Sequence, residues 1–112
     1  MIVLIVYGIP DSFPEEKLKK FWSHLREAVL GINAHKISRH EISIFFPKDR
    51  IQEGLGEEII IFVNDFSGKL VWEEWQKVAE VSGEIAKTYF PKALVNARVF
   101  LLNPGQTFWS ST

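Results

Sequence analysis

Apolar and polar positions along the chain predict four β-strands of two kinds. Nearly continuous apolar runs at Ile2–Tyr7 and Glu58–Asn64 are typical of strands covered on both faces. The segments Glu41–Phe46 and Leu94–Leu102 instead alternate, which predicts strands with one buried and one exposed face.

Two segments between these strands carry apolar residues at helical spacing. The first includes Leu18, Phe21 and Leu25, and we expect its helix to end at Gly31. The second runs from Val71 to Tyr89, and Pro91 prevents its continuation. The predicted order is therefore β-α-β followed by β-α-β.

The two halves form a repeat of pattern within a single predicted domain, residues 1–112. Residues 1–49 and 58–104 correspond, and a shift of 57 residues lays Leu4 on Ile61 and Pro47 on Pro104. Two α+β architectures fit this order. One is the split, ferredoxin-like sheet, and the other joins two parallel β-α-β units by a pseudo-twofold, with both helices on one face.

Composition excludes several classes of protein. The 13 basic and 14 acidic residues give a net charge of -1, which disfavours electrostatic binding of nucleic acid. The apolar runs are too short to span a membrane, and no signal peptide is recognisable. The absence of cysteine excludes disulfides and favours a cytoplasmic location. Four Trp and nine Phe are many for one small core and suggest self-association.

Several short features match one known family in the same order along the chain. They are Ile9-Pro10 after the first strand, Pro47 and Asp49 after the second, Gly54 and Gly56 in the following loop, and Asn103 with Phe108-Trp109-Ser110-Ser111 at the end. With this layout the chain resembles the tautomerase superfamily, including macrophage migration inhibitory factor and 4-oxalocrotonate tautomerase. The resemblance covers essentially the whole chain and implies the pseudo-twofold fold and a homotrimer.

The resemblance also implies a site built around the first residue. Family members use an N-terminal proline as the base in keto–enol tautomerisation, and Met1 stands at that place here. Ile2 is expected to prevent removal of Met1. A terminal primary amine can still act as a base, because α-amino groups have pKa values of about 7.7–8.0. Met1 is therefore the candidate catalytic residue, and the alternative is that it simply begins a strand.

Three further residues, Lys36, Asn96 and Arg98, correspond to the family's ligand-binding positions. Lys36 would lie near the terminal amine and bind a substrate carboxylate, and Asn96 and Arg98 would reach the site of a neighbouring subunit. Arg39 is a weaker candidate for the same role. The alternative for these charges is that they lie on the surface or pair with Glu41.

Three aromatic residues are predicted subunit contacts, namely Trp72, Phe108 and Trp109. No metal site is expected, because the three histidines lack ligand spacing, and no dinucleotide fingerprint or other cofactor motif is present. Three functions remain open. They are a trimeric tautomerase acting weakly or differently on an enol or 2-oxo acid, a non-catalytic binding or structural trimer of the same fold, and a ferredoxin-like module for a small ligand.

Overall fold

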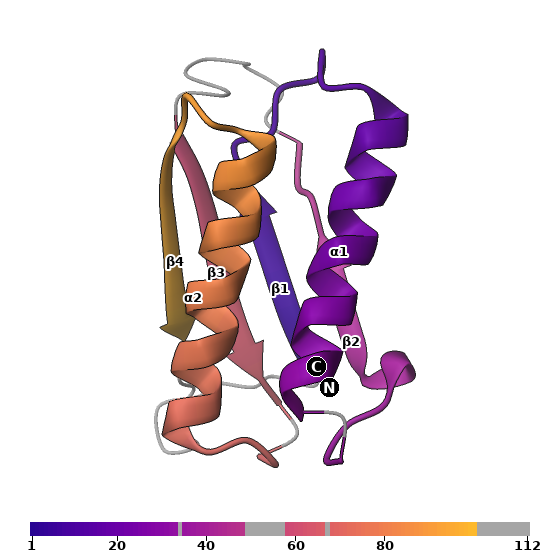
Figure 1. Cartoon of the computed structure of the whole chain (residues 1–112), viewed down its shortest axis with the longest axis vertical. Helices are drawn as coiled ribbons and strands as arrows, with labels where there is room; N and C mark the ends of the chain where they lie inside the picture. Colours follow the sequence, from indigo (N-terminus) through magenta and orange to yellow (C-terminus); the bar gives the residue numbers. More distant parts are fainter. Residues whose placement is uncertain (34, 49–57, 67, 101–112) are drawn as a thin grey trace, which may run out of the picture.

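The structure is a computed structural model that describes residues 1–33, 35–48, 58–66 and 68–100. Its elements in chain order are β1 (Ile2–Tyr7), α1 (Glu15–Asn33), the short 3₁₀ helix η1 (Arg39–Glu41), β2 (Ile42–Phe45), β3 (Glu58–Asp65), α2 (Trp72–Tyr89) and β4 (Leu94–Phe100). All six predicted strands and helices are present (Figure 1). No described helix has the length and apolar character needed to cross a bilayer.

The strand order decides between the two predicted architectures. The four strands form one sheet in the order β2-β1-β3-β4. Strands β1 and β2 are parallel neighbours, and so are β3 and β4, whereas β1 and β3 are antiparallel. Each β-α-β unit therefore joins adjacent strands. The α+β fold with two such units is confirmed, and the split ferredoxin-like alternative is wrong.

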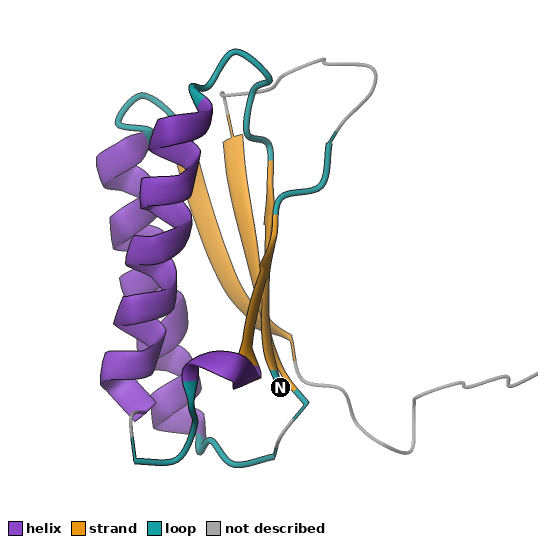
Figure 2. Ribbon diagram, turned by 90° about the vertical axis from the view of Figure 1, so that its right-hand side faces the viewer, coloured by secondary structure: helices purple, strands orange, loops and turns teal. Residues whose placement is uncertain are grey.

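The core lies between the sheet and the two helices, which both cover the same face (Figure 2). Alternate residues of the central strands point into it, and Ile2, Leu4 and Val6 of β1 are fully buried. From α1, Phe21 is fully buried and its ring lies 5.1 Å from that of Tyr89 on α2, centroid to centroid. Aromatic packing thus joins the two helices above the sheet.

The opposite face of the sheet is also apolar, yet no described helix or strand packs against it. The register places on this face Val3, Ile5, Tyr7, Phe45, Ile60, Phe62 and Leu94. We call these seven residues the open face. Phe45 is 55% exposed and Leu94 is 62% exposed. The prediction that β1 is covered on both faces is therefore not met within one protomer.

Several boundaries differ from the predicted ones by one or two residues. Helix α1 continues past Gly31 to Asn33, because Ile32 still packs against the core and a glycine costs a helix only about 1 kcal/mol. Strand β2 begins at Ile42, since η1 takes up Glu41. The last two residues predicted for β4, at positions 101 and 102, lie outside the described residues.

Candidate functional site

Met1 lies at the edge of the open face, between the start of β2 and the end of β3. The register pairs Ile2 with Ile42 on one side and with Asp65 on the other. The N–H of Phe66 donates to the Met1 carbonyl oxygen at 2.8 Å, which fixes the backbone of the first residue. Met1 and Phe66 are 53% and 59% exposed. The terminus is therefore anchored and accessible, rather than enclosed by its own protomer.

Glu41 is the acidic group beside this terminus. Its carboxylate accepts a hydrogen bond from Lys69 Nζ at 2.9 Å and another from the Ser38 N–H at 3.1 Å. These two bonds, Lys69 first, hold the pKa of Glu41 below its ordinary value, and the nearby terminal ammonium of Met1 adds to the effect. The end of the sheet at which Met1 lies thus carries the ionised carboxylate of Glu41, with the Lys69 ammonium and the terminal ammonium near it.

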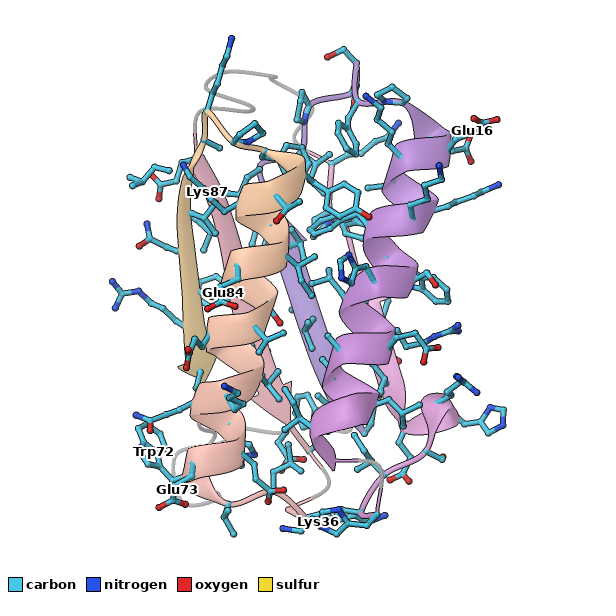
Figure 3. All side chains as sticks on the ribbon, in the orientation of Figure 1. Glu16, Lys36, Trp72, Glu73, Glu84 and Lys87 are labelled. Atoms are coloured by element: carbon cyan, nitrogen blue, oxygen red, sulfur yellow. The ribbon has the colours of Figure 1, made fainter. Side chains whose placement is uncertain are left out.

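Lys36 lies at the end of the molecule where α2 begins (Figure 3). Its ammonium donates to Glu74, whose carboxylate also accepts the N–H of Val71 at 3.1 Å. The bond from Lys36, with that from Val71, lowers the pKa of Glu74. The predicted carboxylate-binding lysine is therefore already paired in the protomer, and a ligand would have to compete with Glu74.

Arg39 is paired as well, on the exposed side of α1. Its Nε and Nη2 atoms donate to the two carboxylate oxygens of Glu27, at 2.9 and 3.0 Å. This pair lowers the pKa of Glu27 and raises that of Arg39. Surface ion pairs are thus present as the alternative interpretation supposed, but the predicted partner is wrong. Glu41 binds Lys69, whereas Lys36 and Arg39 bind other acids.

Asn96 and Arg98 both lie on strand β4, with their side chains on the same side of the sheet as the open face. Asn96 pairs in register with Ile60 and donates to Glu58 at 3.4 Å. Arg98 pairs with Phe62, is exposed, and forms no ion pair with any residue of the described segments. Arg98 is therefore the one predicted ligand-binding cation that is not engaged by a described acid.

A groove of about 480 Å³ lies where α2 crosses the edge strand β4. It is lined by Trp72, Gln76, Ala79, Glu80, Ala97, Arg98 and Val99. Trp72 is half exposed and projects from the first turn of α2 (Figure 3). A predicted subunit contact and a predicted ligand-binding residue thus share one groove. The other predicted contacts, Phe108 and Trp109, lie outside the described residues.

The candidate residues form two separate groups within a protomer. Met1 and Arg98 are two strands apart across the sheet and four residues apart along it, or about 16 Å between Cα atoms. One protomer therefore does not bring the terminal amine and Arg98 to one small ligand. Among the described residues, no three His, Asp or Glu side chains are placed to hold a metal ion.

The sequence did not reveal that Glu74 pairs with Lys36, or that Lys69 pairs with Glu41. Glu74 is 38 residues from Lys36, and Lys69 is 28 residues from Glu41. Pairs between residues so far apart form only after α2 and the segment before it have packed beside the start of the sheet. The position of Glu41 beside Met1 was available in principle, since parallel pairing of the first two strands places their starting residues together.

Known structures resemble this chain although sequences do not. No family model matches the sequence, and no curated protein matches it significantly. Macrophage migration inhibitory factor from Toxoplasma gondii superposes with a TM-score of 0.67 at 9% identity, over 98% of this chain and 97% of that chain. A fused 4-OT, described as a wild-type asymmetric trimer, gives 0.66 at 14% identity, over 94% of each chain.

A third structure, Pt0534 inactivated by 2-oxo-3-pentynoate, gives a TM-score of 0.67 at 9% identity, over 98% of this chain and 92% of that chain. Such low identity shows a common fold and leaves activity open. The similarity extends over almost the full length of all three relatives, as the residue motifs predicted. The chain therefore has the fold of macrophage migration inhibitory factor and fused 4-OT.

Proposed function

We propose that the protein is a homotrimer with a ligand site between subunits, which binds a small enol or 2-oxo acid. The Met1 amine of one subunit would act as the base. Arg98 and Asn96 of a neighbour would hold the ligand's carboxylate and oxygen atoms. The observation that carries the proposal is that Met1 is separated within the protomer from Arg98, which forms no ion pair with a described residue. A second copy could supply what the first lacks.

The open face supports the association of copies. Strands β1 and β3 are apolar on both faces, and the helices cover one face alone. A sheet that is apolar on both sides is stable in water when the second side is covered too. The relatives described as fused 4-OT trimers have the same fold, which suggests three copies as the arrangement.

The catalytic form of the proposal predicts that the terminal amine is required. The test is conversion of the enol form of a 2-oxo acid to its keto form, followed by the loss of the enol's ultraviolet absorbance. It is measured before and after selective acetylation of the Met1 α-amine. Loss of turnover with retained assembly supports an amine base. Equal turnover by the acetylated protein contradicts it.

Two variants separate the proposed ligand contacts. Arg98→Gln should weaken ligand binding about tenfold or more, because it removes a charged hydrogen-bond donor. Arg39→Gln tests the weaker candidate. It should leave ligand binding unchanged if the only role of Arg39 is its ion pair with Glu27. Unchanged binding by Arg98→Gln would contradict the proposed site.

A non-catalytic trimer is the second candidate, and two observations favour it. Met1 stands in place of the family's proline, and Glu74 neutralises Lys36 in the protomer. In that case a carboxylate ligand binds between subunits and is recovered unchanged. Product analysis by NMR after long incubation distinguishes the two candidates.

A further inference from the structure

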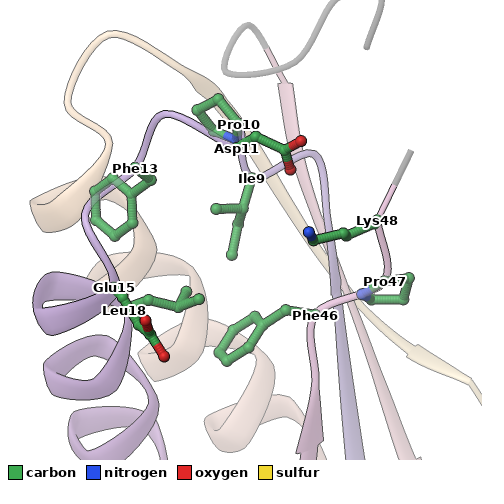
Figure 4. Close-up of a pocket in the computed structure, with 9 residues that line it drawn as sticks. All are labelled: Ile9, Pro10, Asp11, Phe13, Glu15, Leu18, Phe46, Pro47 and Lys48. Carbon is green, nitrogen blue, oxygen red and sulfur yellow. The ribbon is translucent and has the colours of Figure 1, made fainter. Parts of the chain in front are cut away.

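A second cavity lies at the far end of β1, about 25 Å along the strand from Met1. Its volume is about 450 Å³, within the range of small-molecule sites. It opens beyond the carboxyl ends of the parallel strands β1 and β2, beside the start of α1 (Figure 4). Crevices in this position are common ligand sites in sheets of parallel β-α-β units. It shares no described residue with the proposed intersubunit site.

The wall of this cavity is apolar. Ile9, Phe13, Leu18 and Phe46 line it, and all four are partly buried against the core. Phe13 and Phe46 are fixed from behind, because their rings pack 4.6 Å from Phe90 and 5.8 Å from Phe21, centroid to centroid. The cavity thus offers a preformed apolar surface for a side chain or ring.

Charges of both signs lie around this apolar wall. The Lys48 ammonium points into the cavity from the segment after β2, and the carboxylates of Asp11 and Glu15 lie on the side of the β1–α1 connection and α1 (Figure 4). None of the three forms an ion pair or hydrogen bond with another residue in the described part of the chain. All three are exposed, so a ligand can reach them.

We propose that this cavity binds a free α-amino acid with an apolar or aromatic side chain. Lys48 would bind its carboxylate, Asp11 and Glu15 its ammonium group, and the apolar wall its side chain. A simple carboxylate cannot pair with the two acids, and a simple amine cannot pair with Lys48, so each would make only part of these contacts. A zwitterion satisfies both, which makes it the ligand that this charge arrangement favours.

The probe is L-phenylalanine, titrated into the full ¹⁵N-labelled chain and followed by backbone amide shifts. We expect saturable shifts at residues 9–18 and 46–48. 3-Phenylpropanoate, which lacks the amine, and 2-phenylethylamine, which lacks the carboxylate, should each bind about tenfold more weakly or worse. Absence of saturable shifts with L-phenylalanine, or equal binding of the three compounds, would overturn the proposal.

Two variants assign the charges. Lys48→Gln should remove the preference for L-phenylalanine over 2-phenylethylamine, and Glu15→Gln should reduce the preference over 3-phenylpropanoate. Glu16→Gln is the matched control, since Glu16 is the next residue of α1, is exposed and does not line the cavity. Since all these side chains are exposed, far-ultraviolet circular dichroism should match the wild type. Equal selectivity in Lys48→Gln and the wild type would overturn the assignment.

Discussion

Replacing Phe45 on the open face with glutamate should weaken self-association without unfolding the protomer. Phe45 belongs to the edge strand β2 and is 55% exposed. For a phenylalanine of about 200 Å², this leaves about 110 Å² that a partner can cover. At about 25 cal/mol per Å², covering it contributes about 2.8 kcal/mol, so its loss weakens each contact about a hundredfold. Desolvation of the new carboxylate adds to this loss.

Sedimentation velocity over a concentration series measures the change. We expect Phe45→Glu to dissociate at concentrations where the wild type remains assembled, with an unchanged circular dichroism spectrum. Thr88→Glu is the control, because it adds the same charge on the exposed surface of α2, away from the sheet. If Phe45→Glu and the wild type sediment alike at every concentration, the open face is not the contact surface.

Three further predictions concern the protomer, all measured by urea unfolding. Phe21→Ala should reduce the free energy of unfolding by about 3–5 kcal/mol, since this ring is fully buried, and a loss below about 1 kcal/mol would contradict the described core. Gly8→Ala should cost more than Gly68→Ala, because both glycines have positive φ but only at Gly8 would a Cβ clash, 2.1 Å from a backbone oxygen. Equal losses of unfolding free energy in the two variants would show that the backbone moves to relieve the clash at Gly8. Glu74 has a folded-state pKa below its ordinary value of 4.5, so it contributes stability above that pH which is lost as the pH falls toward the folded-state pKa. Glu74→Gln should therefore lose less stability than the wild type between about pH 6 and about pH 3, and an identical loss would refute the pairing.

The fold was predictable because its hydrophobic pattern is local and strong. The run Ile2–Tyr7 and the helical spacing around Phe21 each determine one element with little competition. The predicted end of the first helix at Gly31 was wrong, because packing of Ile32 against the core outweighs the cost of one glycine. The hydrophobic pattern does not show whether the two strands of each β-α-β unit are neighbours in the sheet or are separated by another strand. The family motifs led to the fold that the strand order shows.

The candidate site was harder to predict, because charge pairing depends on packing between distant elements. Spacing along the chain placed Lys36 near the amine end, but it could not reveal that the turn of α2 carrying Glu74 lies against it. Trp72 and Arg98 were assigned separate roles, and their common groove appears only when α2 lies across β4. The pattern of β1 predicted two covered faces. One protomer covers only one of them, and the open face is the surface that the proposed second copy would cover.

The proposed function requires that copies of this chain assemble and complete a site between them. The decisive measurement is a native mass spectrum of the untagged protein. We expect a trimer whose subunit mass includes Met1. A monomer at concentrations well above those in a cell would contradict it, because the Met1 amine and Arg98 would then have no second copy to bring them together.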